Sequence, residues 1–371
     1  MGSKPTIKTY NKKQPKKVDP SFAGRVAIIG AFKSEVVTPK SYSTLTEAVT
    51  DLGAYDSSDV FLGNKALNIL FGKDNTGKDI QGVTGVTSIL AVNVATKSGS
   101  TWTKTLDATS LTTALGKIKY ESFDYLFIAT DDISDALLAV ITPFTSERHL
   151  NKHPCGYGGY IAARTGESAS AIKQAYKATA DATDDFCYGL IPAQTVKING
   201  ATFDALETSA YYCALLASTN VGSSLTQKTL PAVEGLGTEY SFETASVGEY
   251  LVEYGFMAID CYDRENSEYL IVNSEQPNGY DLYINRVRDY VLRAFNLHQF
   301  LGERNRTPTL SEIGAMLSLV KESCVKNLDF LADIEYTVEK VAPKKARVTV
   351  TKLLFDDIIT DIEVYYTIEV Q

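Results

Sequence analysis

Residues 25–32 read RVAIIGAF, an apolar run that a single glycine interrupts near its end. A short run rich in branched side chains is typical of a strand that is buried on both faces of a sheet. Two amphipathic segments follow, TLTEAVTDLG at 44–53 and SSDVFLGNKALNILFG at 57–72, and each ends on a glycine. Glycine often terminates a helix because it adopts the left-handed backbone conformation at low cost. This part of the chain therefore predicts a buried strand followed by two helices.

The same alternation of apolar strands and amphipathic helices continues to residue 277. SILAVNVA at 88–95 and DYLFIAT at 124–130 have the composition of buried strands, and SLTTALGKIKY at 110–120 has helical spacing of its apolar residues. Strands that alternate with helices are typical of an α/β sheet that is covered by helices on both faces. We therefore expect residues 21–277 to form an α/β domain of that kind.

A different pattern occupies residues 278–354. Two helical segments, 281–306 and 307–328, precede two β-prone segments that a lysine-containing turn joins. In the second helix, Thr309 and Glu312 have the spacing of a capping box, which predicts where that helix begins. We expect an α+β C-terminal domain of two helices and a β ribbon here.

The two ends of the chain carry opposite charges. Residues 1–18 contain six lysines and no acid, whereas residues 355–371 contain five acids and no base. The N-terminal segment 1–20 is expected to be an extended arm, because its prolines and lysines leave little to bury. The C-terminal segment alternates strictly between apolar and polar residues, which predicts a strand with one apolar face.

A basic arm and an acidic strand are natural partners, because an open strand edge can accept another strand by backbone hydrogen bonds. Pairing within one chain and pairing between neighbouring chains both remain open from the sequence. The residues that we expect in this pairing are Thr6, Ile7, Lys8, Thr9 and Tyr10 in the arm and Ile362, Val364, Tyr366, Ile368 and Val370 in the strand.

The composition argues against several classes of function. The chain has 371 residues and a formal net charge of −9, whereas a nucleic-acid partner favours an excess of Lys and Arg. No apolar run approaches the roughly 18 residues that a membrane span needs, and the lysine-rich N-terminus does not have the pattern of a secretory signal. The five cysteines stand singly, as expected for a protein made in a reducing cytosol.

The motifs that could carry chemistry are incomplete. GKDNTGKD at 72–79 has the spacing of a phosphate loop, but Asp79 stands where Ser or Thr would hold magnesium. His149 and His153 are four residues apart, but Leu150 stands where a zinc peptidase has glutamate, so a solvated helix end is the expected setting. No G-x-S-x-G nucleophile turn occurs. We expect no catalytic residue, metal or cofactor, and the alternative is an α/β enzyme of hydrolase-like architecture.

The C-terminal part of the chain resembles the contractile tail sheath proteins of contractile-tailed phages and phage-tail-like bacteriocins. The resemblance is carried by YDLYINRVRDYVLRAFNLHQFLGERNRTPTLSEIGAMLSLV at 280–320, followed by the β ribbon. FAGRVAIIGAF at 22–32, TLTEAVTDLG at 44–53 and SSLTQKTLPAVEGLG at 223–237 also resemble segments of that family. The resemblance covers most of the chain and implies a compact sheath protein without large outer domains.

The resemblance implies a structural, non-enzymatic role. Sheath subunits form stacked hexameric rings in a helix around an inner tail tube, and their other partners are the baseplate and the sheath-terminator proteins. Contraction, in which the subunits rotate and move outward nearly as rigid bodies, drives the tube through a target envelope without nucleotide. Such a protein is made in the bacterial cytoplasm, resides in the phage tail or phage-tail-like particle, and neither binds nucleic acid nor inserts into membranes. A tube or terminator protein is a further alternative, but those are usually smaller and β-dominated.

The family also implies which residues of this chain meet other subunits. Arms of neighbouring subunits add strands to the C-terminal sheet, which is expected to include Arg347, Val348, Val350 and Leu353. A helix of the same domain contacts the tube, and the tube-facing candidates are Lys321, Lys326, Arg286, Arg288 and Arg293. The alternative for these cations is a solvated helix face.

Overall fold

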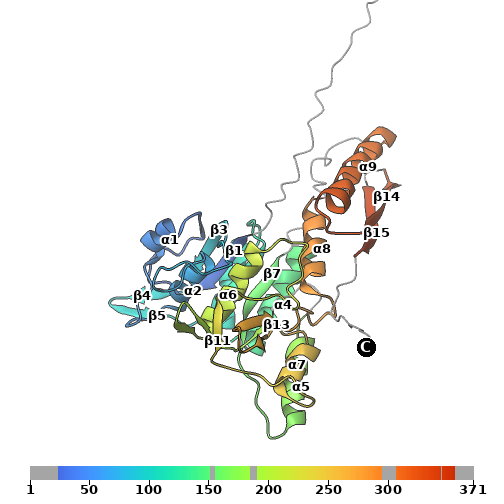
Figure 1. Cartoon of the computed structure of the whole chain (residues 1–371). Helices are drawn as coiled ribbons and strands as arrows, with labels where there is room; N and C mark the ends of the chain where they lie inside the picture. The colour runs from blue at the N-terminus through green and yellow to red at the C-terminus, as the bar shows by residue number, and fades with distance from the viewer. Residues whose placement is uncertain (1–23, 151–154, 184–189, 295–305, 344, 356–371) are drawn as a thin grey trace, which may run out of the picture. The chain divides into compact units, whose positions relative to one another are not determined.

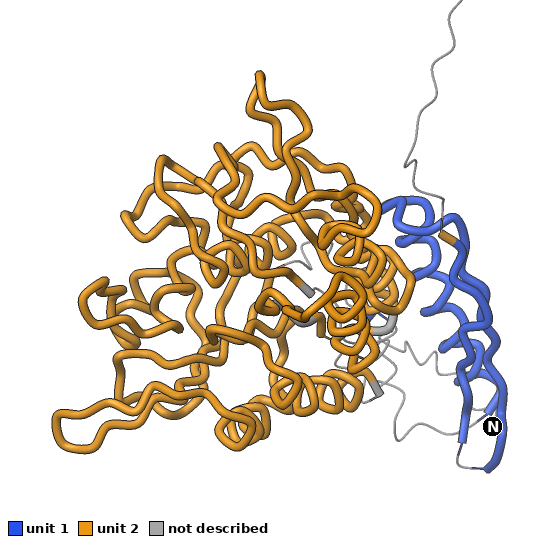
Figure 2. The backbone as a smooth tube through the Cα atoms, turned by 90° about the horizontal axis from the view of Figure 1, so that it is seen from below, with its two compact units in different colours: residues 1–21, 294–354 blue, residues 22–293, 355–371 orange. Residues whose placement is uncertain are grey.

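The computed structural model describes residues 24–150, 155–183, 190–294, 306–343 and 345–355. The chain divides into two compact units, which Figure 2 colours separately. We call residues 22–293 together with 355–371 the sheet unit, and residues 294–354, with which residues 1–21 are grouped, the ribbon unit. Each unit is described by itself.

The sheet unit is built on a six-stranded sheet with the order β2-β3-β1-β6-β7-β8 (Figure 1). Its strands are β1 (Arg25–Gly30), β2 (Lys40–Tyr42), β3 (Ser88–Asn93), β6 (Tyr125–Ala129), β7 (Gly156–Ile161) and β8 (Leu190–Pro192). All pairings are parallel except that of the short edge strand β2 with β3. Parallel neighbours need long crossovers, and helices supply them.

Alternate residues of β1 belong to two different cores. Val26 and Ile28 pack into one core with the helices α1 (Leu45–Leu52), α2 (Leu62–Leu70) and α6 (Ala205–Ser218). Ala27 and Ile29 pack into the other core with α3 (Ala108–Ile118), α4 (Asp135–Leu150), α5 (Ala169–Asp181) and α7 (Val247–Glu253). Because successive side chains of a strand point to opposite faces, helices cover both faces of the sheet. The predicted α/β class is confirmed.

Smaller elements complete the sheet unit. They are β4 (Thr96–Ser98), β5 (Thr101–Thr103), β9 (Val196–Ile198), β10 (Ala201–Phe203), β11 (Val233–Leu236), β12 (Ile259–Asp263), β13 (Glu268–Ile271) and α8 (Leu282–Ala294). The buried residues of α8 include Val287, Tyr290 and Val291, which were expected on its apolar stripe. The boundary between the units follows Arg293, so nearly all of α8 belongs to the sheet unit, whereas the sequence suggested a division before residue 278.

The ribbon unit contains one helix and one antiparallel strand pair. Helix α9 (Thr307–Glu322) continues as a π-helix, η2 (Ser323–Asn327), and is followed by β14 (Asp333–Ala342) and β15 (Lys345–Leu354). The capping box expected at Thr309 is wrong, because α9 begins earlier, with Arg306 as its N-cap and proline in its first turn. Proline is favoured in a first turn, where its missing N–H has no helical partner. Among the described residues, no helix is long and apolar enough to cross a membrane.

Candidate functional site: the β ribbon and the α8 anchor

The β ribbon has one apolar face. Strands β14 and β15 pair from Asp333 opposite Leu354 to Ala342 opposite Lys345, with two bulges. Residues directly opposite each other in such a pair lie on the same face. The apolar face is formed by the pairs Ile334 and Leu353, Tyr336 and Val350, and Val338 and Val348. The Tyr336 hydroxyl fixes this face to α9, since it lies 2.6 Å from Ser318 Oγ and donates to the Gly314 carbonyl at 3.2 Å.

The opposite face of the ribbon is charged. Glu335 faces Lys352 at 3.9 Å, and Glu339 accepts a hydrogen bond from Arg347 at 3.3 Å. Their side chains are all about half exposed. Exposed ion pairs of this kind contribute little to stability, on the order of 0–1 kcal/mol each, so these charges remain available to another strand.

Both outer edges of the ribbon are open in the part of the chain that the structure describes, because no third strand pairs with β14 or β15. An isolated two-stranded ribbon is marginally stable, and open edges are templates for further strands. The expected acceptor residues Arg347, Val348, Val350 and Leu353 all lie on β15. Their role as acceptors stays a prediction. The expected arm residues Thr6 to Tyr10 and strand residues Ile362 to Val370 lie outside the described residues.

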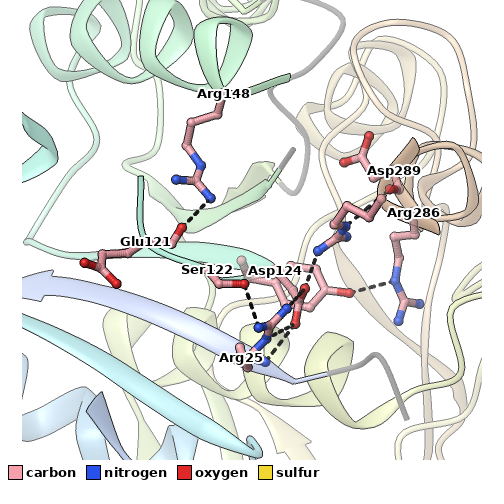
Figure 3. Close-up of polar contacts among 9 residues, drawn as sticks. Arg25, Glu121, Ser122, Asp124, Arg148, Arg286 and Asp289 are labelled. Atoms are coloured by element: carbon pink, nitrogen blue, oxygen red, sulfur yellow. Dashed lines mark hydrogen bonds and ion pairs between the residues drawn. The ribbon is translucent and has the colours of Figure 1, made fainter. Parts of the chain in front are cut away.

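A buried charge cluster holds α8 in the sheet unit (Figure 3). Asp124, which precedes β6, is 3% exposed. Its carboxylate accepts the backbone N–H of Arg25 at 3.1 Å and two guanidinium N–H groups of Arg25 at 3.4 Å. Arg293, near the end of α8, also donates to it. Asp124 therefore joins the first residue of β1 to the last turn of α8.

Arg286 fixes the middle of α8. It is 2% exposed, and its Nε donates to the Tyr125 hydroxyl at 2.9 Å. Its other nitrogens donate to the carbonyls of Leu216 at 2.9 Å, Thr219 at 2.7 Å and Asn220 at 3.2 Å. These carbonyls lie at the C-terminal end of α6, where a cation is favourable. Burial raises the pKa of the Tyr125 hydroxyl, which therefore stays neutral.

Two residues of α4 extend the cluster. His149 Nδ1 lies 3.5 Å from Oδ1 of the buried Asp289 of α8. The expectation that His149 lies on a solvated helix end is wrong, since its side chain is largely covered; His153 lies outside the described residues. Arg148 donates to the carbonyls of Lys119 and Glu121 and stacks 3.8 Å from the centre of the Phe123 ring. It thereby caps the end of α3, and burial lowers its pKa.

The structure separates the tube-facing candidates into two groups. Arg286 is buried and bonded as described, and Arg288 and Arg293 are largely covered and in contact with Asp289 and Asp124. In the ribbon unit, Lys321 pairs with Asp333 at 2.5 Å. Lys326 is 72% exposed, with Glu322 at 3.6 Å. Only the two lysines therefore remain candidates for contact with a tube.

The sequence contained a signal for the buried group that our reading missed. Arg286, Asp289 and Arg293 are spaced by three and four residues, so they share one face of α8 beside its apolar stripe. A polar stripe at that spacing predicts a second contact face.

The crevice where α/β enzymes of this strand order bind ligands is filled by the chain itself. In such sheets the site lies beyond the carboxyl ends of the strands where the order reverses, here β1 and β6. A Cβ at Gly30 would lie 2.8 Å from the Ala129 Cβ and 3.1 Å from the Gly63 Cα. The buried Asn93 side chain accepts the N–H of Phe32 at 3.0 Å and donates to the Ser34 carbonyl at 2.6 Å. Its polar atoms are thus used by the chain's own loop.

The two incomplete motifs do not gather ligands. The loop after Gly72 is a polar turn, in which the Asp74 carboxylate accepts from Thr76, Lys78 and Asn199. No group of three or more His, Cys, Asp or Glu side chains that could hold a metal occurs among the described residues. Nothing in the described part of the chain favours the hydrolase-like alternative.

Solved structures with this fold come from contractile systems. A sheath tail protein of Desulfitobacterium hafniense matches with a TM-score of 0.60 at 11% identity, over 94% of this chain and 99% of that chain. A sheath tail protein of Listeria innocua matches with a TM-score of 0.57 at 11% identity, over 89% and 94%. The anti-feeding prophage helical sheath in its contracted state matches with a TM-score of 0.63 at 11% identity, over 99% of both chains.

Neither family models nor curated protein sequences give a match. The structural matches cover nearly the full length of each chain, so they concern the whole arrangement of elements. The chain therefore has the fold of the contractile tail sheath proteins, which confirms the family that its sequence resembles.

Proposed function

We propose that this protein is the structural subunit of a contractile tail sheath. It assembles as stacked hexameric rings around an inner tail tube, and contraction drives the tube through a target cell envelope. The observation that supports this most is the open-edged β ribbon in a chain with the sheath fold. Because two packings of one chain can differ in free energy, contraction needs no nucleotide. The role is structural rather than enzymatic.

Strand exchange links the subunits in this proposal. The N-terminal arm and the C-terminal strand of neighbouring copies add to the ribbon, with Thr6 to Tyr10 and Ile362 to Val370 as the donated segments. Reach supports this, because about 17 extended residues span on the order of 55 Å. The backbone supplies hydrogen bonds for affinity, and alternate side chains supply specificity.

Other partners follow from the same role. Lys321 and Lys326 are the remaining candidates for contact with the tube. The baseplate and a sheath terminator would meet the two ends of the assembly. The protein would reside in a phage tail or a phage-tail-like particle.

Electron microscopy and sedimentation across a concentration series test the proposal. The full chain should form rings or hollow tubes. Chains that lack residues 1–20 or 356–371 should remain monomeric, with the melting temperature of the sheet unit unchanged. The proposal fails if the full chain and both truncated chains form the same small particles at every concentration.

A further inference from the structure

The two strands of the ribbon carry opposite charges. Strand β14 has the acids Asp333, Glu335 and Glu339 against the single base Lys340. Strand β15 has the bases Lys345, Arg347 and Lys352 and no acid. One open edge of the ribbon is therefore acidic and the other is basic.

The two ends of the chain carry the complementary charges. The N-terminal segment 1–18 has six lysines and no acid, and the C-terminal segment 355–371 has five acids and no base. Strands that add to a sheet lie about 4.8 Å from their neighbour, so side chains directly opposite each other interact. Opposite charges there are favourable, and like charges are destabilising.

We infer that charge assigns each terminal segment to one edge of the ribbon: the lysine-rich N-terminal segment of a second copy adds beside β14, and the acidic C-terminal segment of a second copy adds beside β15. This inference rests on the proposed function and deepens it. It gives every ribbon two different neighbours, and hence gives the assembly a direction.

The spacing of the charges agrees with the assignment to β14. Glu335 and Glu339 are four residues apart on the charged face of the ribbon, as their pairs with Lys352 and Arg347 establish. In the N-terminal segment, Lys4, Lys8 and Lys12 also recur every four residues. Residues four apart in a strand lie on the same face. Two of these lysines can therefore lie beside the two glutamates in one register.

The alternation of the C-terminal segment agrees with the assignment to β15. Its apolar residues Val364, Tyr366 and Ile368 would extend the apolar face that Val348, Val350 and Leu353 form with β14. Its acids Asp361, Glu363 and Glu369 have the opposite parity and would then lie on the charged face, where Arg347 and Lys352 are. The exchanged assignment would place acids beside Glu335 and Glu339 and lysines beside Arg347 and Lys352.

Charge reversal with rescue tests the assignment. Lys4→Glu, Lys8→Glu and Lys12→Glu together should raise the concentration at which half the chains assemble by about tenfold. Adding Glu335→Lys and Glu339→Lys should restore assembly, whereas adding Arg347→Glu and Lys352→Glu should not. The reciprocal set, Glu363→Lys with Glu369→Lys, should be rescued by the β15 reversal and not by the β14 reversal.

A matched control separates position from net charge. Lys78, Lys197 and Lys228 are exposed in the sheet unit, and reversing all three changes the net charge by the same amount as reversing the arm. This control should leave the assembly midpoint within about twofold. Melting of each variant below the assembly concentration reports damage to the ribbon itself.

The identity of the donor copy is tested by disulfide trapping. Thr349→Cys and Thr367→Cys are placed in two differently tagged chains in a Cys261→Ser background, and the mixture is oxidised. A product that carries both tags, absent when either new cysteine is missing, is expected for donation by a second copy. No such product, with cross-linking only in the double variant, would show that the C-terminal segment adds to its own ribbon and would overturn that half of the inference.

Failure of the inference and failure of the proposed function are distinguishable. The assignment is overturned if each reversal is rescued by the other edge, or if the arm reversal behaves like the control while the truncations still prevent assembly. Assembly that survives both truncations would instead contradict the proposed function.

Discussion

Replacing Asp124 by asparagine should destabilise the sheet unit by about 2–4 kcal/mol. The Asp124 carboxylate is 3% exposed and lies between the guanidinium groups of Arg25 and Arg293. Removing one partner of a buried ion pair costs about 3–5 kcal/mol, because the remaining charge is left buried. The figure is reduced here because Arg25 is about one-third exposed and the amide oxygen still accepts hydrogen bonds. For a unit of this size, the loss corresponds to a fall in Tm of roughly 5–12 °C.

Urea denaturation of the full chain below its assembly concentration measures this loss. Hydrogen exchange should also show faster exchange in α8 than in β1, because Arg293 loses its partner whereas β1 keeps its strand pairing. The matched control is Glu239→Gln, which removes the 2.7 Å ion pair with Arg264. Both of those side chains are more than half exposed, so the control should cost less than about 1 kcal/mol. Equal losses in the two variants would refute the idea that burial makes the Asp124 cluster important.

Three further predictions concern other parts of the chain. Tyr336→Phe removes the hydroxyl contacts to Ser318 and the Gly314 carbonyl, so exchange in α9 and β14 should become faster by the equivalent of about 0.5–1.5 kcal/mol; unchanged exchange would contradict it. Burial raises the pKa of Glu207 above its ordinary 4.5, so the folded chain binds that proton more tightly and stability falls as pH rises from 4.5 through the folded pKa. Glu207→Gln should remove this fall in a series of Tm measurements, and an identical pH profile would count against the argument. Val364→Lys with Ile368→Lys should leave the monomer folded but prevent sedimentation as assemblies, and early melting would show instead that this segment closes its own domain.

Much of the fold follows from local sequence patterns. The run at Arg25–Gly30 is apolar at every position after the first, and such a run cannot be satisfied on a half-exposed strand. The alternation of β14 and β15 was equally readable, because their period of two separates Ile334, Tyr336 and Val338 from the charged face. These features depend on residues close together in the sequence, so one chain suffices to predict them.

The α8 anchor depends on partners far away in the sequence. Arg286 is bonded to residues of α6 and β6, and Arg293 to a residue before β6. A charged residue beside an apolar stripe is usually solvated, and only tertiary contacts show that these two are not. The same reason placed the domain boundary before α8, where the composition changes, rather than after Arg293, where the packing changes.

The energetics of strand addition explain why side chains on the ribbon edges should matter. Each backbone hydrogen bond contributes about 1 kcal/mol net, whereas ordering the backbone of one residue costs about 1–2 kcal/mol. Backbone bonding alone therefore does not hold an arm that becomes ordered only on binding. The difference must come from apolar contacts such as those along Val348 and Val350, and from charges such as Glu335 and Lys352. Contacts of a few tenths to 1 kcal/mol then decide which segment binds which edge, and repetition over many subunits makes weak links into a continuous assembly.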